Sequence, residues 1–319
     1  MFMKSIPCLS LLTLLLPVCT VCFSESEAEK ATLQIELTTP KAKLISGEPV
    51  VLDVTISNPT RKSMPYHPIL PLQESGSGIK LFIQRPGDPE PSRYVPVMYA
   101  MLVFEEPLYL EPGEAYSDRS VLFTDGNMTN REDPLFIRES GMYRFHVVYS
   151  YSGYDQSETY ILESEPLEIE AVESAEKEND NAREIWSQIL YRTGGMPFSW
   201  DNTWSPRPDA LKNLLQPLLE QDDVTIFGQY ARYMVGTNPS IYGRAEHGEW
   251  EQYQRETLED LAYDPSFPLT NDALYHLAES CFSGRTQEDF EKATALMDEF
   301  QERAPYSSLI RRYLKQRGE

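Results

Sequence analysis

The spacing of apolar residues changes once along this chain, near position 175. Before that point, apolar and polar residues alternate over short stretches, which is typical of strands with one buried face. Pro, Gly, Asn and Asp separate the stretches, which lie at 33–38, 50–57, 79–84, 95–104, 116–123, 142–151 and 166–172. Short strands with turn signals between them predict two antiparallel sheets facing each other, in a β-domain of residues 31–172.

After position 175 the apolar residues recur every three or four positions, which indicates amphipathic helices. Seven stretches have this pattern: 182–192, 209–221, 227–234, 249–263, 272–282, 290–303 and 307–316. The intervening segment ESAEKENDN, residues 173–181, is charged and has no apolar periodicity, so it is predicted to be a linker. The expected fold class is therefore multidomain, β then α, with antiparallel helix pairs over residues 182–319.

The amino terminus resembles an export signal. Lys4 precedes an apolar stretch from Ile6 to Phe23, and Ser24 offers a cleavage point. We expect residues 1–24 to be a signal peptide and the mature protein to be periplasmic, cell-surface or secreted, without membrane insertion after cleavage. A retained anchor and lipid attachment at Cys19 or Cys22 are the alternatives. After cleavage Cys281 is the one remaining cysteine, so no internal disulfide is expected.

The charge of the chain excludes one class of partner. It carries 28 basic and 50 acidic residues, for a net charge of -22. Such a balance repels phosphate backbones and anionic lipid surfaces, and no basic cluster offsets it. We therefore expect no nucleic-acid partner.

The stretch ESGMYRFHVVYSY, residues 139–151, resembles the tyrosine corner of immunoglobulin-like β-sandwiches. The resemblance implies that Gly141 allows a tight approach and that the Tyr143 hydroxyl bonds back to the backbone. The turn-and-strand segments 46–58 and 110–123 fit the same family of modules, which are common in exported bacterial proteins. The paired cysteines and strand tryptophan of antibody domains are absent, so the resemblance supports a fold and not antigen recognition.

The last helices resemble tetratricopeptide repeats. Leu277 and Ala278 match the large and small pair of the first helix, Ala293 the small residue at the helix crossing, and Pro305 the terminal proline. Pro265 precedes Pro305 by 40 positions, a spacing typical of stacked helix pairs. The gap between Ala278 and Ala293 is longer than the family pattern, and the family's tryptophan and first-helix tyrosine are not matched. The resemblance implies a helical repeat over one or two units.

An aromatic loop between the first two predicted helices holds the candidate binding residues Phe198, Trp200 and Trp204. Exposed tryptophans stack on sugar rings or clamp peptides. The alternative is that these rings fill a groove between the sheets and the helices, since large aromatic side chains are usually covered.

A second loop, residues 123–134, carries Asp125, Asn127, Asn130 and Asp133, whose oxygens could surround a calcium ion. The DxDxDG frame of a calcium loop is missing, so an ordinary polar loop is favoured and no metal or other cofactor is expected.

Catalytic motifs are missing from the sequence. It has no GxSxG, no HExxH, no phosphate-binding glycine loop and no CxxC after residue 24. His276 and Cys281 are five positions apart on one predicted helix, an offset that suits facing side chains poorly, so a buried core cysteine is favoured. The acidic cluster around His247, made of Glu246, Glu249 and Glu251, is most simply a solvated helix face.

These observations lead to a functional expectation. The sequence indicates an exported, non-enzymatic protein that binds a protein or peptide partner, because helix pairs and sheet loops both present binding surfaces. Carbohydrate or cell-wall binding through the loop tryptophans is the alternative. An unrecognised hydrolase is the third possibility.

Overall fold

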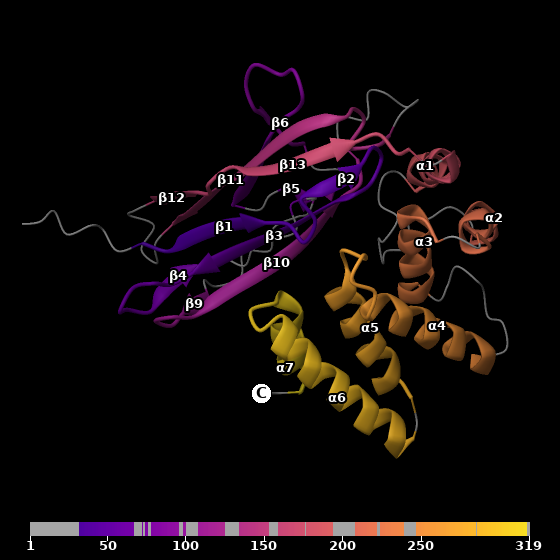
Figure 1. The fold of residues 1–319 in the computed structure, drawn as a ribbon. Helices are drawn as coiled ribbons and strands as arrows, with labels where there is room; N and C mark the ends of the chain where they lie inside the picture. Colours follow the sequence, from indigo (N-terminus) through magenta and orange to yellow (C-terminus); the bar gives the residue numbers. More distant parts are fainter. Residues whose placement is uncertain are drawn as a thin grey trace, which may run out of the picture. The chain divides into compact units, whose positions relative to one another are not determined.

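A computed structural model shows how these elements are arranged. It describes residues 32–66, 72, 74–75, 78–95, 98–99, 108–124, 134–152, 159–175, 177–193, 208–221, 224–238, 247–284 and 286–317. The fold and sites discussed below belong to residues 32–319, where β-sheets precede seven helices in the described part of the chain (Figure 1).

Two sheets make up most of the β part. The first has the antiparallel order β1-β3-β10, with β1 at Gln34–Thr38, β3 at Val50–Ser57 and β10 at Ala115–Leu122. The second has the order β2-β13-β11-β6-β7 and consists of β2 (Lys43–Ile45), β13 (Leu167–Val172), β11 (Gly141–Ser152), β6 (Ile79–Gln84) and β7 (Ser92–Arg93). Strand β12 (Thr159–Glu163) also pairs with β11, beside β13. The pairing of β2 with β13 is parallel, and the other pairings in this sheet are antiparallel.

Two further pairs are short: β4 (Met64–Tyr66) with β9 (Leu108–Leu110), and β5 (Glu74–Ser75) with β8 (Met98–Tyr99). The strands predicted near 33–38, 50–57, 79–84, 116–123, 142–151 and 166–172 are confirmed as β1, β3, β6, β10, β11 and β13. The structure describes only Val95 and β8 (Met98–Tyr99) of the strand predicted over 95–104.

The two main sheets share one apolar core. Alternate residues of β3, among them Leu52 and Ile56, and of β11, among them Phe145 and Val147, are buried in the same cluster. This alternation is the reason that these sequences form strands, because each of these strands turns one face toward the core between the sheets.

The helical part contains α1 (Lys177–Arg192), α2 (Pro208–Leu219), α3 (Ile226–Thr237), α4 (His247–Ala262), α5 (Thr270–Phe282), α6 (Gln287–Arg303) and α7 (Ser308–Arg317). These confirm the seven predicted helices. Thr225 and Thr286 cap α3 and α6, because their hydroxyls accept hydrogen bonds from the amides of Gly228 and Asp289.

The predicted linker over 173–181 is too long. Helix α1 already begins at Lys177, within that segment. A charged segment without apolar periodicity can still be the first turn of a helix, because charged side chains on that turn remain solvated while later residues of the helix, such as Trp186, pack in the core.

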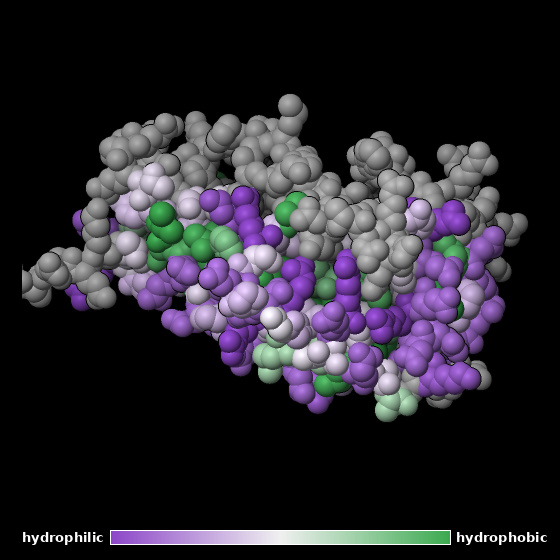
Figure 2. Space-filling view, turned by 90° about the horizontal axis from the view of Figure 1, so that it is seen from above, coloured by the Kyte–Doolittle hydropathy of each residue, from purple (hydrophilic) through white to green (hydrophobic). Residues whose placement is uncertain are grey.

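The sheets and helices are joined by apolar contacts. Three side chains of the β part, Val51, Phe123 and Leu135, belong to the buried cluster of the helices. The Phe123 ring lies 6.2 Å from Trp186 of α1 and 6.5 Å from Tyr230 of α3, measured between ring centroids. On the face shown in Figure 2, hydrophilic residues cover most of the surface that is not grey, in agreement with the charged composition.

Candidate functional site

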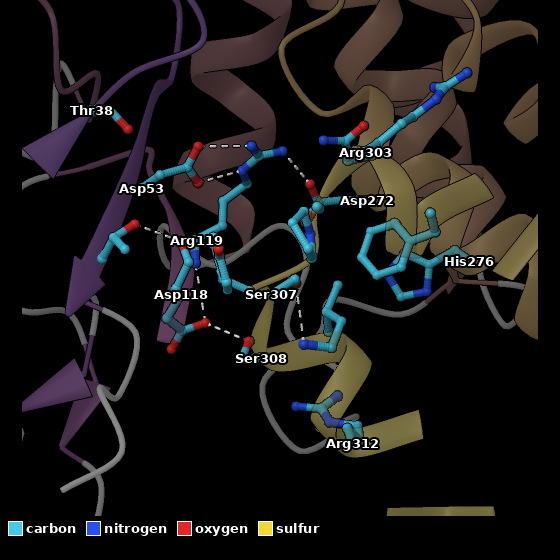
Figure 3. Close-up of a pocket in the computed structure, with 18 of the residues that line it drawn as sticks. Thr38, Asp53, Asp118, Arg119, Asp272, His276, Arg303, Ser307, Ser308 and Arg312 are labelled. Atoms are coloured by element: carbon cyan, nitrogen blue, oxygen red, sulfur yellow. Dashed lines mark hydrogen bonds and ion pairs between the residues drawn. The ribbon is translucent and has the colours of Figure 1, made fainter. Parts of the chain in front are cut away.

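A polar cleft lies between the first sheet and the last helices. We call it the helix–sheet cleft; its volume is about 740 Å³. Its walls come from β1, β3 and β10 on one side and from α5, α6, α7 and the turn between α6 and α7 on the other. Figure 3 shows side chains from both sides directed toward one another across this space.

Arg119 of β10 links the two walls. Its Nε and Nη2 donate to the two carboxylate oxygens of Asp53 on β3, over 2.7 and 2.8 Å, and its Nη1 donates to Asp272 of α5 over 2.6 Å (Figure 3). All three side chains are about four-fifths buried. Burial alone would lower the pKa of Arg119, but Asp272 and Asp53 hold it above its ordinary value. The guanidinium is therefore a fixed, paired cation and is not available as a proton donor.

Asp118, the residue before Arg119, has a different environment. One carboxyl oxygen accepts hydrogen bonds from the Ser308 hydroxyl of α7 over 2.8 Å and from the Arg119 amide over 3.1 Å. Burial raises the pKa of Asp118 to about 7, although Ser308, the Arg119 amide and Arg312 oppose the rise. Asp118 therefore gains and loses a proton near neutral pH.

The far wall of the cleft carries an imidazole–carboxylate pair on α5. His276 Nδ1 lies 3.0 Å from Glu279 Oε2, one helical turn along. Burial alone would raise the pKa of Glu279, but its hydrogen bonds with His276 and Tyr275 hold it below the ordinary value. The pair forms a stable polar wall of the cleft.

The four carboxyl groups that line the cleft each have a partner within the protein: Asp53 and Asp272 share Arg119, Glu279 bonds to His276, and Asp118 bonds to Ser308. These contacts join the sheet to the helices or lie within α5.

A second depression, of about 770 Å³, borders the first sheet; we call it the edge groove. From β1 and the residue before it, four consecutive residues, Leu33 to Glu36, line the groove, and from β12 three consecutive residues, Ile161 to Glu163, do so. Side chains on a strand point alternately to opposite faces. Consecutive residues can therefore line the same groove only if the backbone edge of the strand borders it.

Both strands that border the edge groove are at sheet edges. Among the described residues, β1 pairs only with β3, and β12 pairs only with β11. Each strand therefore has one edge without a strand partner in that part of the chain. Exposed edges present rows of N–H and C=O groups that another chain can use.

The two depressions share two lining residues, Thr55 and Tyr306. Thr55 lies on the outer face of β3, and Tyr306 lies in the turn between α6 and α7, where its carbonyl accepts a hydrogen bond of 2.7 Å from the Ser117 amide of β10. The Tyr306 side chain is half exposed. The helix–sheet cleft and the edge groove thus meet at the outer face of the first sheet.

The predicted binding residues Phe198, Trp200 and Trp204 lie outside the described residues, as do Asp125, Asn127, Asn130 and Asp133 of the loop considered for calcium. The side chains of Glu246, His247, Glu249 and Glu251 lie outside the described part as well. In the part of the chain that is described, no group of three His, Cys, Asp or Glu residues is placed to hold a metal ion.

The remaining predicted residues are described. Cys281 is fully buried as a free thiol, which confirms the core position, and the cleft contains His276 but not Cys281. Gly141 has a φ of 138°, and the Tyr143 hydroxyl donates to the Glu139 carbonyl over 3.1 Å, the backbone bond implied by the tyrosine corner.

Sequence reasoning missed Asp118, Arg119 and Asp272. The available signal was the adjacent Asp-Arg pair inside the strand YSDRSVLF, because one of two adjacent residues in a strand must point toward the buried face.

No described helix is both long and apolar enough to cross a membrane.

Comparisons with known proteins give no family. No protein-family model matches the chain, and no curated protein matches it. The solved structures that match include a β-glucosidase from Listeria innocua in complex with glucose, at 16% identity and a TM-score of 0.24, covering 44% of this chain and 16% of the glucosidase. The matched part of this chain therefore spans about one-sixth of the length of that enzyme.

Two other matches are of the same strength. The CARDB domain of a protein from Pyrococcus furiosus, in complex with di-metal ions, is 11% identical, with a TM-score of 0.24, 45% of this chain and 94% of that domain covered. The sporulation control protein Spo0M from Bacillus subtilis is 14% identical, with a TM-score of 0.24, 49% of this chain and 55% of that chain covered. At these scores the matches carry no functional argument.

Proposed function

We propose that this chain is an exported, non-enzymatic binding protein that holds an extended segment of a protein partner in the edge groove, as an added β-strand. The observation that carries the proposal is the lining of the groove by consecutive residues of β1 and β12, each of which has an edge without a strand partner among the described residues. An extended peptide placed there would satisfy those backbone groups and bury its alternate side chains.

We further propose that the β part is immunoglobulin-like. The support is the Tyr143–Glu139 hydrogen bond at the start of β11, together with the strand orders β1-β3-β10 and β13-β11-β6 in two sheets that share a core. In this arrangement β1 belongs to one sheet and β2 to the other, and β1 and β12 lie beside each other, each with one edge that has no strand partner among the described residues.

The helical part is proposed to be tetratricopeptide-like at its end. Leu277 and Ala278 of α5 and Ala293 of α6 are completely buried, as expected of residues where two helices cross closely. The same helices form one wall of the helix–sheet cleft, so this part of the chain would extend the binding surface beyond the edge groove.

The charge of the edge groove indicates the chemistry of the partner. The charged side chains that line it are all carboxylates: Glu36 of β1, Glu163 of β12 and Glu165 just beyond β12. The chain as a whole carries a charge of -22. A segment with lysine or arginine at alternate positions would therefore be favoured, and acidic segments would be repelled.

A fluorescent peptide of alternating lysine and valine tests the proposal by anisotropy. Two further peptides carry backbone N-methyl groups, one on the lysines and one on the valines. An added strand bonds to the sheet through alternate residues, so one methylated peptide should bind and the other should not. Equal binding by the two methylated peptides, or no binding by the unmethylated one, would contradict strand addition.

Charge-reversal variants then locate the site. Glu36→Lys combined with Glu163→Lys should weaken binding of the lysine–valine peptide at least tenfold, whereas Asp260→Lys on α4, outside both depressions, should change it less than twofold. An equal loss in both proteins would indicate general electrostatic attraction instead of binding in the groove.

A further inference from the structure

The end of the chain is attached to the first sheet by a small set of polar contacts. We call residues Ala304–Arg317 the C-terminal latch; they comprise the turn after α6 and helix α7. Ser117 of β10 forms a parallel bridge with Ser307, and its amide donates to the Tyr306 carbonyl over 2.7 Å. The latch therefore covers part of the edge of β10.

Side chains of Ser308 and Arg311 add further contacts between the latch and the β part. Ser308, the first residue of α7, donates its hydroxyl proton to Asp118. Farther along, Arg311 lies over the rings of Tyr66 and Tyr116, at 5.7 and 5.1 Å from their centroids, and donates to the Tyr66 hydroxyl. Of these contacts, the one that involves Asp118 depends directly on a carboxyl proton.

The position of Asp118 is unusual for a carboxyl group. It lies on the same face of β10 as Tyr116, Ser120 and Leu122, which are buried, and α7 covers it from the side. The charged and titratable groups that face it are Arg312 of α7, Asp272 of α5, and Tyr116 and Arg119 of its own strand. Arg312 is the one cation among them that is exposed, and Arg119 is already paired with two carboxylates.

We propose that a proton on Asp118 holds the C-terminal latch against β10, and that ionisation of this carboxyl loosens the latch. A neutral carboxyl tolerates burial between β10 and α7 better than an ionised one does. An ionised one loses hydration there, and it regains water when the latch moves away.

The sign of the pH dependence follows from proton linkage. With the latch docked, burial raises the pKa of Asp118 to about 7; with the latch released, the carboxyl is solvated and its pKa returns toward 3.8. The docked state then binds more protons between these two values, so docking is strongest in acid and weakens as the pH rises through 7. From pH 6 to pH 8, the docking equilibrium should fall about tenfold.

The latch also borders the proposed binding groove. Tyr306 belongs to the latch and lines both the helix–sheet cleft and the edge groove. This consequence rests on the proposed function: release of the latch removes the Tyr306 wall, so an extended peptide should bind more weakly at pH 8 than at pH 6. The behaviour of the latch itself does not depend on any peptide.

Hydrogen exchange of the full-length protein tests the latch. Exchange of the Ser117, Leu309 and Ile310 amides is measured at pH 6 and at pH 8. Dividing the intrinsic exchange rate at each pH by the observed rate gives a protection factor, and these factors are compared between the two pH values. In the unmodified protein these protection factors should be about tenfold lower at pH 8. In Asp118→Asn, a neutral side chain of the same shape, they should differ less than twofold between the two pH values.

Two further variants test the direction and the specificity of the effect. Ser308→Ala removes a hydrogen bond that lowers the pKa of Asp118, so the loss of protection should move to higher pH. Asp298→Asn, an exposed carboxylate of α6, should keep the tenfold fall. Constant protection in the unmodified protein, or an unchanged fall in Asp118→Asn, overturns the proposal.

The peptide measurement separates this proposal from the proposed function. If the latch responds to pH as described but the lysine–valine peptide does not bind at either pH, strand addition is wrong and the latch proposal stands. If the peptide binds equally at both pH values while the latch responds, Tyr306 is not part of the binding site.

Discussion

Replacing Arg119 by methionine tests how the helices are held to the first sheet. Methionine replaces the apolar stem of the side chain but has no guanidinium, so Asp53 and Asp272 lose the cation that they share. The side chains of Asp53 and Asp272 are only 20% and 18% exposed, which places this link between a buried and a surface ion pair. The loss of stability in the variant decides whether the link behaves as a buried or as a surface ion pair.

The expected cost follows from that burial. Removing one partner of a buried ion pair costs about 3–5 kcal/mol, because the remaining charge is left uncompensated, whereas an exposed pair contributes about 0–1 kcal/mol. With four-fifths burial and two carboxylates left unpaired, we expect Arg119→Met to lower the free energy of unfolding by about 3 kcal/mol at pH 7.5. Arg119→Lys keeps the charge but cannot form the two-pronged contact with Asp53, and should cost about 1–2 kcal/mol.

Urea denaturation followed by circular dichroism measures this loss at pH 7.5. The triple variant Arg119→Met, Asp53→Asn, Asp272→Asn should regain part of the stability, since no charge is left buried. A loss below about 1 kcal/mol at pH 7.5, or no recovery in the triple variant, would refute the reasoning.

Two predictions concern the start of β11. Tyr143→Phe removes the hydroxyl that donates to the Glu139 carbonyl and should cost about 1 kcal/mol in a denaturation experiment; no loss would mean that this bond does not fix the corner. Gly141→Ala should cost more, about 2–3 kcal/mol, because the backbone has a φ of 138° and the added Cβ would lie 2.8 Å from the ring of Pro86. Gly113→Ala is its control, since Gly113 also has a positive φ but a Cβ there would meet nothing within 4 Å. Equal losses of stability at the two sites would assign the whole effect to the backbone conformation and none to the contact with Pro86.

Much of the fold could be predicted from the sequence, because long strands and helices bury one face repeatedly. Burial alternates along β3 from Leu52 to Ser57, and the seventeen residues of α6 place Ala293, Leu296, Met297 and Phe300 in the core at helical spacing. Strands β2, β4 and β9 escaped prediction because each has three residues, which is too short to display a period.

The candidate site was harder to predict, because its contacts join distant parts of the chain. Arg119 and Asp272 are 153 positions apart, and Asp118 and Ser308 are 190 apart. A single sequence gives no sign of which carboxylate will meet which cation at such distances. The edge groove depends on which strands lie at the ends of the sheets, and this follows from the order of pairing and not from the pattern within any one strand.

Two kinds of contact join the sheets to the helices, and they differ in how they respond to solvent. Near α1 and α3, Phe123 packs against Trp186 and Tyr230 inside a continuous apolar cluster. Such packing does not depend on pH and opens only when the core itself opens. Near α5 and α7 the contacts are ionic or hydrogen-bonded and line a polar cleft.

The difference assigns a separate role to each junction. Water can replace the bonds of Asp118 and Ser117 one at a time, whereas an apolar cluster loses its contacts together. We therefore expect a conformational change that preserves the fold to take place at the polar junction, while the apolar junction stays closed. Tyr306 lies at that polar junction and borders the edge groove, so any movement of the latch changes the surface offered to a partner.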